Sequence, residues 1–135
     1  MSQQQMQEYQ QIQQQLQQIQ QYIEQVEQRV EEVDETIESV DQLSNIEEGS
    51  ELLAPIGPGA YIKTTISKTD KVVTDLGGDS MQEKDLDSAQ DVLNDQRQEL
   101  EQTKQELENQ TQELQQRMQK IQQSIQQERQ QQQEE

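Results

Sequence analysis

Apolar residues recur along the first 46 positions at alternating intervals of three and four, separated mostly by glutamine and glutamate. An a/d heptad pattern that continues for more than four heptads is typical of a helix in a coiled coil. The pattern therefore predicts one long helix over this segment. The a positions are Tyr9, Leu16, Ile23, Val30 and Ile37, and the d positions are Ile12, Ile19, Val26, Val33 and Val40.

A second heptad pattern occupies residues 85–135, where an aliphatic residue stands at every seventh position. Its d positions are Leu86, Leu93, Leu100, Leu107, Leu114 and Ile121. Met118 and Ile125 supply apolar a positions near the end, whereas the earlier a positions are Gln90, Arg97, Lys104 and Thr111. We expect a second long helix in which the d positions are apolar throughout, whereas most of the a positions are polar.

An antiparallel pairing in which the residue numbers of each layer add up to 130 satisfies both seams. Every a position of the first helix then meets a d position of the second, as Ile23 meets Leu107. In the alternate layers, the stem of a basic residue such as Arg97 can lie along a valine while its charge reaches acids such as Glu32 and Asp34. Two independent helices with separate partners are the alternative, but the shared register favours a hairpin.

The middle of the chain, residues 47–84, holds both prolines and all five glycines. Four short β-prone runs, 50–56, 60–67, 71–76 and 80–84, alternate there with Gly, Pro and Asp turns, which predicts two β-hairpins. The expected α+β chain is one structural unit of three segments: an N-terminal coiled-coil helix (1–46), a β-hairpin assembly module (47–84) and a C-terminal coiled-coil helix (85–135).

The stretch GPGAYIKT, residues 57–64, resembles a phosphate-binding P-loop except that Ile62 stands where the second glycine belongs. A P-loop needs its Lys-Thr pair to open a helix whose backbone amides hold phosphate. Here Lys63 and Thr64 lie inside a β-branched run. We therefore interpret the stretch as a hairpin turn and its return strand, with no nucleotide cofactor.

Four short strands with so few aliphatic side chains cannot bury a stable core alone, and their edges are open to pairing. We expect other subunits to complete them into a β-barrel body from which the helical arm projects. The residues assigned to subunit assembly are Leu53, Ile56, Ile62, Ile66, Val72 and Leu76.

The net charge of −18 argues against nucleic acid and anionic membrane as partners, because phosphate groups must be met by Lys and Arg. The longest apolar run, Leu52-Leu53-Ala54, is far too short to span a membrane, and no secretory signal is visible. We expect a cytoplasmic protein. The acidity, with only six lysines, also suits a very salty cytosol.

The chain lacks both cysteine and histidine, so it has no thiolate zinc site and none of the commonest general bases or metal ligands. Only scattered Asp, Glu, Lys and Tyr are left for chemistry, and no spacing groups them into a pocket. The sequence therefore argues against an enzyme and predicts no metal or cofactor.

LLAPIGPGAYIKTTI, DKVVTDLGG and the pair Glu83-Lys84 follow one another between the two heptad helices. With these motifs in this order, the chain resembles the alpha subunit of archaeal prefoldin. The resemblance covers about residues 5–128, and two hairpins instead of one favour the alpha over the beta subunit. The helices are unusually rich in glutamine, and Asp79-Ser80-Met81 is more polar than the family's strand, which leaves the length of the fourth strand open.

The resemblance implies a holdase that works without ATP. Two alpha and four beta subunits would build a double β-barrel body carrying six coiled coils. The arm tips would grip unfolded proteins and deliver them to a group II chaperonin.

We expect the client-binding tip at the free ends of the helices, where the seam degrades and Gln5 faces Ile125. Flexible methionine suits irregular apolar partners. The assigned residues are Met6, Tyr9, Ile12, Met118, Ile121 and Ile125. Two alternatives stay open: Ile12, Met118 and Ile121 only complete the coiled coil, or the whole chain is a structural adaptor with a β docking module.

Overall fold

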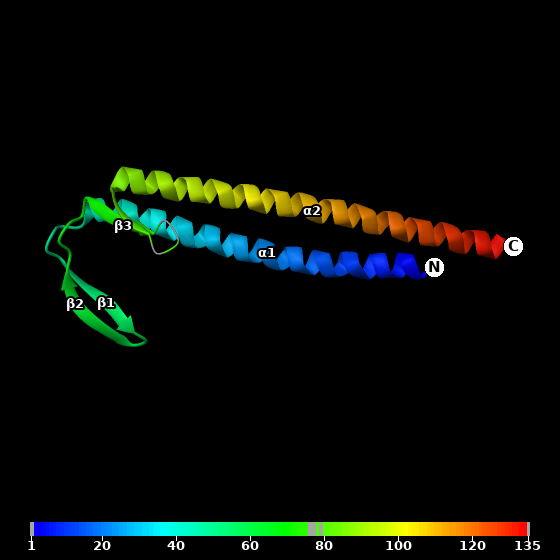
Figure 1. The fold of residues 1–135 in the computed structure, drawn as a ribbon, viewed down its shortest axis with the longest axis horizontal. Helices are drawn as coiled ribbons and strands as arrows, with labels where there is room; N and C mark the ends of the chain where they lie inside the picture. The colour runs from blue at the N-terminus through cyan, green and yellow to red at the C-terminus, as the bar shows by residue number, and fades with distance from the viewer. Residues whose placement is uncertain (1, 76–77, 79, 135) are drawn as a thin grey trace. The chain divides into compact units, whose positions relative to one another are not determined.

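The structure, a computed structural model, describes residues 2–75, 78 and 80–134, with side chains described up to Gln131. The chain forms two compact units, a first unit of residues 1–30 and 99–135 and a second unit of residues 31–98. Its elements follow the order α1 (Gln3–Gln42), a 3-10 turn (Leu43–Asn45), β1 (Glu51–Gly57), β2 (Ala60–Thr65), β3 (Lys71–Asp75), β4 (Met81–Asp85) and α2 (Leu86–Glu134) (Figure 1).

The predicted seams of both helices are buried or half-buried along their whole length. In the first unit Ile12 and Ile23 are the most covered, at 3% and 7% exposed. In the second unit Val33, Val40 and Ala89 are buried, and Ala89 has no exposed surface at all. The heptad interpretation is therefore confirmed, and these apolar rows hold the helices together, at about 25 cal/mol for each Å² removed from water.

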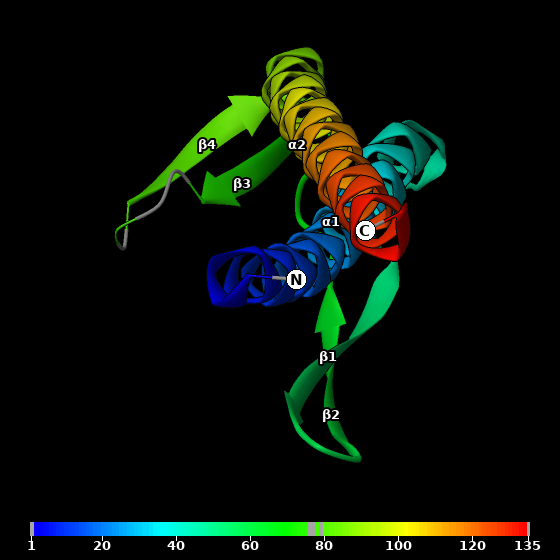
Figure 2. The same cartoon turned by 90° about the vertical axis from the view of Figure 1, so that its right-hand side faces the viewer.

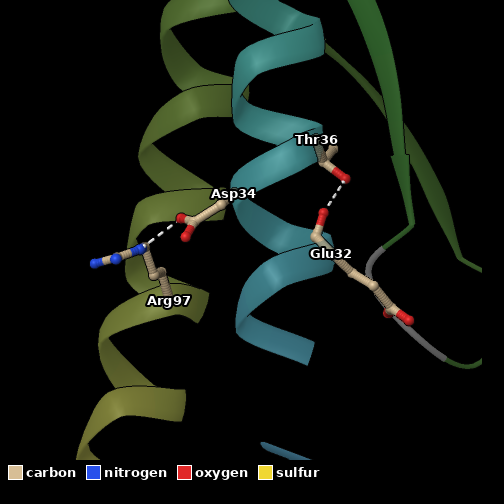
Figure 3. Close-up of polar contacts among 4 residues, drawn as sticks. All are labelled: Glu32, Asp34, Thr36 and Arg97. Atoms are coloured by element: carbon tan, nitrogen blue, oxygen red, sulfur yellow. Dashed lines mark hydrogen bonds and ion pairs between the residues drawn. The ribbon is translucent and has the colours of Figure 1, made fainter. Parts of the chain in front are cut away.

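Polar contacts beside the seam report the register. In the first unit Lys104 Nζ lies 3.4 Å from Glu27 Oε1, and in the second Arg97 Nε donates to Asp34 Oδ1 at 2.6 Å (Figure 3). Glu27 follows Val26, which the predicted register pairs with Lys104, and Asp34 follows Val33, which it pairs with Arg97. The predicted antiparallel register is therefore confirmed. These side chains are 30% to 52% exposed, and such pairs contribute only about 0–1 kcal/mol each.

The region between the helices forms two separate antiparallel hairpins (Figure 2). Leu53 lies opposite Lys63 in the β1–β2 pair, and Val73 lies opposite Glu83 in the β3–β4 pair. Gly59 supports the first turn at φ 77°, a conformation that favours glycine. Among the described residues, each strand has a ladder partner on one edge only, so the other edge is open.

The strand ends lie close to the predicted ones. β2 ends at Thr65, two residues earlier than expected. The backbone pairing nevertheless continues, since Ile66 N donates to Ser50 O at 2.9 Å and Gly49 N donates to Ile66 O at 2.7 Å. The fourth strand, whose length the sequence left open, has five residues.

α2 begins at a side-chain cap that the sequence analysis did not identify. Asp85, the last residue of β4, accepts a hydrogen bond from Ser88 N at 2.8 Å, as an N-cap residue does. Hydrogen bonds from the side chain and backbone of Ser88 lower the pKa of Asp85, and the charges of Lys71 and Lys84 act in the same direction. The ionised carboxylate therefore stabilises the junction between the second hairpin and α2.

The register can be tested with paired cysteines. Ile23→Cys and Leu107→Cys share a layer in the first unit, so mild oxidation of the dilute chain should form an intramolecular disulfide in high yield. Ile23→Cys with Leu114→Cys, one heptad out of register, is the control and should cross-link poorly. Non-reducing gels and mass spectrometry measure both yields, and equal yields would contradict a single register.

The Asp85 cap predicts a pH-dependent stability. The folded-state pKa is lowered, so the cap stabilises fully above the unfolded-state pKa and is lost as pH falls through the folded-state pKa. Asp85→Ala should lower the thermal midpoint of unfolding at pH 7, and its deficit relative to the unmodified chain should vanish at acidic pH. Asp85→Asn is the control, because Asn caps helices without titrating. A deficit of Asp85→Ala that persists at acidic pH would refute the carboxylate's role.

Candidate functional site

An open groove lies in the first unit between the beginning of α1 and the end of α2. We call it the tip groove: it is lined by Met6, Tyr9, Ile125, Arg129 and four glutamines. Its volume is about 570 Å³, within the range of about 300–1,000 Å³ typical of ligand-binding clefts. The groove can therefore admit apolar side chains of a partner chain.

The six predicted tip residues fall into two groups. Met6, at 44% exposed, and the half-buried Tyr9 and Ile125 line the tip groove. Met118 and Ile121 are half-buried, whereas Ile12 is only 3% exposed. In this conformation the side chain of Ile12 is covered, so a client could reach it only if the helices separated.

Two polar features distinguish the tip: a hydrogen bond to Tyr9 and, in the last layer, a buried oxygen of Gln5. Gln122 Nε2 donates to the Tyr9 hydroxyl at 3.2 Å, which steadies the ring beside the groove. Gln5 Nε2 donates to Ser124 Oγ at 3.3 Å, while Gln5 Oε1 is buried and no donor among the described residues reaches it. An unsatisfied buried acceptor costs about 1–3 kcal/mol, so this layer holds the helix ends together poorly.

The first hairpin forms a second candidate surface, because it exposes apolar side chains on both faces. Leu53, Ile56 and Ile62, all assigned to assembly, are 59%, 65% and 47% exposed, and Ile66 is half-buried. Two neighbours, Leu52 (52%) and Tyr61 (60%), are about equally exposed but were not among the predicted assembly residues. Strand alternation alone would have found them, since an uncovered hairpin presents both of its faces.

The second hairpin exposes one face more than the other. Val73 and Met81, which point to the same side of the β3–β4 ladder, are 65% and 71% exposed. The predicted assembly residue Val72 is half-buried on the opposite face, and Leu76 lies outside the described residues. Exposed apolar groups gathered on small hairpins usually mark an interaction surface.

Tyr22 is a further exposed aromatic residue that the sequence analysis did not assign. It is 55% exposed and lines a shallow hollow together with Ile19 and Leu114 in the first unit. The sequence did contain a signal for this exposure, because Tyr22 occupies a heptad position beside the apolar seam and not one within it. This hollow is separate from the tip groove, with which it shares no lining residue.

The structure also bears on the P-loop-like stretch. Lys63 and Thr64 lie in β2, and the Thr64 hydroxyl donates to Leu52 O across the hairpin at 2.7 Å. The interpretation as a turn and return strand is confirmed. Within the described part of the chain, no group of three or more acidic side chains is arranged to hold a metal ion, and neither helix is apolar enough to cross a membrane.

Comparison with known proteins agrees with the resemblance. The chain is 35% identical over 60 residues to prefoldin subunit alpha of Thermofilum pendens, which is 44% of this chain and 46% of that protein. It is 35% identical over 59 residues to prefoldin subunit alpha of Haloarcula marismortui, covering 44% of this chain and 38% of that one. The matched stretch thus spans less than half the length of these relatives.

The fold matches a solved structure more completely. A chain in the cryo-EM structure of filamentous PFD from Methanocaldococcus jannaschii superposes with a TM-score of 0.79 at 20% identity, covering 85% of this chain and 95% of that chain. A family model described as prefoldin subunit matches residues 12–131. Because that match includes both heptad helices and both hairpins between them, the chain belongs to the prefoldin family.

Proposed function

We propose that the chain is an alpha-type subunit of a hexameric chaperone that holds unfolded proteins without ATP and delivers them to a group II chaperonin. The observation that carries the proposal is the tip groove, an open hollow lined by Met6, which is 44% exposed, together with the half-buried Tyr9 and Ile125. Prefoldin is a chaperone family and not an enzyme family, which fits a protein that binds instead of catalysing.

The tip groove suits unfolded chains because its apolar groups are small in number and adaptable. Burial of one such side chain contributes about 1.5–3 kcal/mol, so one arm binds weakly and releases readily. Methionine adjusts to irregular partners, and the glutamines around it can bond to an exposed backbone. Several arms on one body would then hold a client through effective concentration.

One feature of the chain supports the proposed independence from ATP. The one stretch that resembles a nucleotide site is a β-hairpin, with Thr64 bonded across it to Leu52. Binding and release in this subunit would therefore depend on exposed apolar surface alone. We place this activity in the cytoplasm.

Assembly would take place through the hairpins. Their open edges and exposed apolar faces need partners, and beta-type subunits in a ratio of two alpha to four beta would provide them. We assign these contacts to Leu53, Ile56, Ile62, Ile66, Val72 and Leu76, and we add Leu52, Tyr61, Val73 and Met81 because of their exposure.

Charges placed on the hairpin should block assembly. The double variant Ile62→Asp and Ile66→Asp should abolish the hexamer formed with a co-expressed beta-type subunit, because two carboxylates would have to be buried unpaired. Native mass spectrometry measures the assembly, and circular dichroism should show that the helices persist. Gln14→Asp with Gln21→Asp adds the same charge on an exposed helix face and should leave the hexamer intact. A well-folded monomer that ignores its partner would favour the adaptor instead.

Polar substitution in the tip groove should reduce holdase activity. Met6→Ser with Ile125→Ser should weaken suppression of client aggregation several-fold, since each arm loses two apolar contacts and avidity multiplies the loss. The control Tyr22→Ser removes a more exposed apolar group outside the groove and should change little. Light scattering of a chemically unfolded client reports the effect. Full protection by the double variant would place the client surface elsewhere.

A further inference from the structure

The charge of the chain is unevenly distributed. Residues 3–16 contain one acid, Glu8, and residues 114–131 contain Arg117, Lys120 and Arg129 against Glu128, so these two stretches together carry 3 − 2 = +1. The whole chain carries −18, so the remaining residues carry −18 − 1 = −19. The two stretches that form the tip groove are therefore far less acidic than the chain as a whole.

The three cations near the tip are not equivalent. Arg117 is bonded to Glu8, with Nη2 3.2 Å from Oε1. Lys120 is exposed and does not line the tip groove, whereas Arg129 lines it together with Met6 and Ile125. None of the described residues that line the groove is acidic. Arg129 thus places a positive charge beside an apolar surface, with no carboxylate among the described lining residues to offset it.

This pairing of charge and apolar surface has a specific chemical complement. A guanidinium binds carboxylates through two parallel hydrogen bonds, and its planar face tolerates apolar neighbours better than an ammonium does. Along the rest of the two helices, residues 17–42 and 86–113, sixteen acids stand against three bases, and this surface repels carboxylates within about one Debye length, which is about 10 Å at 0.1 M salt. A carboxylate next to an apolar run is therefore accepted at the tip groove and disfavoured along the rest of the two helices.

We propose that Arg129 makes the tip groove selective for apolar segments of unfolded proteins that are flanked by Asp or Glu. The apolar residues of the segment occupy the surface formed by Met6, Tyr9 and Ile125, and the flanking carboxylate pairs with the guanidinium. The inference rests on the proposed function, since it names the class of client segment that the groove takes.

The test uses the full chain and two synthetic peptides with the same central run of leucine and valine, one flanked by aspartates and the other by lysines. NMR titration of the labelled chain suits weak binding and gives a Kd for each peptide. Because the chain is acidic overall, the informative quantity is the ratio of the lysine-peptide Kd to the aspartate-peptide Kd. Arg129→Gln should lower this ratio about two- to fivefold, as expected for one exposed ion pair.

Two control variants separate the groove from general electrostatics. Lys120→Gln removes the same charge from the same helix outside the groove and should leave the ratio unchanged. Arg129→Lys keeps the charge and should retain most of the ratio, and salt near 1 M should reduce the difference between the unmodified chain and Arg129→Gln.

The outcomes distinguish the inference from the proposed function. If both peptides bind and Arg129→Gln leaves the ratio unchanged, or Lys120→Gln lowers it equally, the selectivity of Arg129 is refuted while client binding stands. If neither peptide perturbs the resonances of Met6 or Ile125 in the unmodified chain, client binding by the groove itself is refuted.

Discussion

A chain with 27% hydrophobic residues and no Phe or Trp can hold two long helices together only if most of their apolar side chains lie on one stripe of each helix. Heptad spacing achieves this, and the stripe includes the buried residues Ile12, Ile23, Val33 and Val40. Little apolar material remains to cover the hairpins or the helix ends. The exposed hairpin faces and the tip groove are therefore consequences of the same scarcity.

The ion pairs beside the apolar seam form in the observed register, but they do not distinguish it from a register shifted by one heptad. Acids follow the seam valines at 26–27, 33–34 and 40–41, so a slip of one heptad would still offer a carboxylate to most of the cations. The extent of the apolar seam decides between the alternatives. In one direction of slip, Tyr9 would lose Ile121 and face Glu128; in the other, Met118 and Ile121 would lose their apolar partners. Only the observed register pairs both helices over their full apolar length.

The sequence was informative wherever a repeat decides which way a side chain points. Ile23 and Val33 were predicted to be internal because heptad spacing assigns each position to one face of the helix. The turn at Gly59 was equally readable from its composition. The prediction of helix, two hairpins and helix therefore needed no tertiary information.

The exposure of individual side chains was harder to predict, because it depends on which other residues cover them. A sequence repeat gives the face on which a side chain lies but not what covers that face. Strand alternation puts Val72 and Val73 on opposite faces but does not say which is covered, and Val73 proved to be the exposed one. Met6 and Ile12 belong to the same predicted tip, yet one is accessible and the other buried. The cap at Asp85 was different in kind: an aspartate three residues before Ser88 was legible in the sequence and was overlooked.

The acids of α1 that bond to the cations of α2 also disfavour the pairing of α1 with a second α1 helix. Both the a and the d positions of α1 are apolar, so α1 is a better coiled-coil helix than α2. A second α1 from another molecule would therefore offer it a more apolar seam than α2 does. In a parallel pair carboxylates would face carboxylates, because eight of the nine acids of residues 3–42 lie between Glu24 and Asp41 on both helices. This repulsion opposes the pairing of two α1 helices before α2 of the same chain is in place.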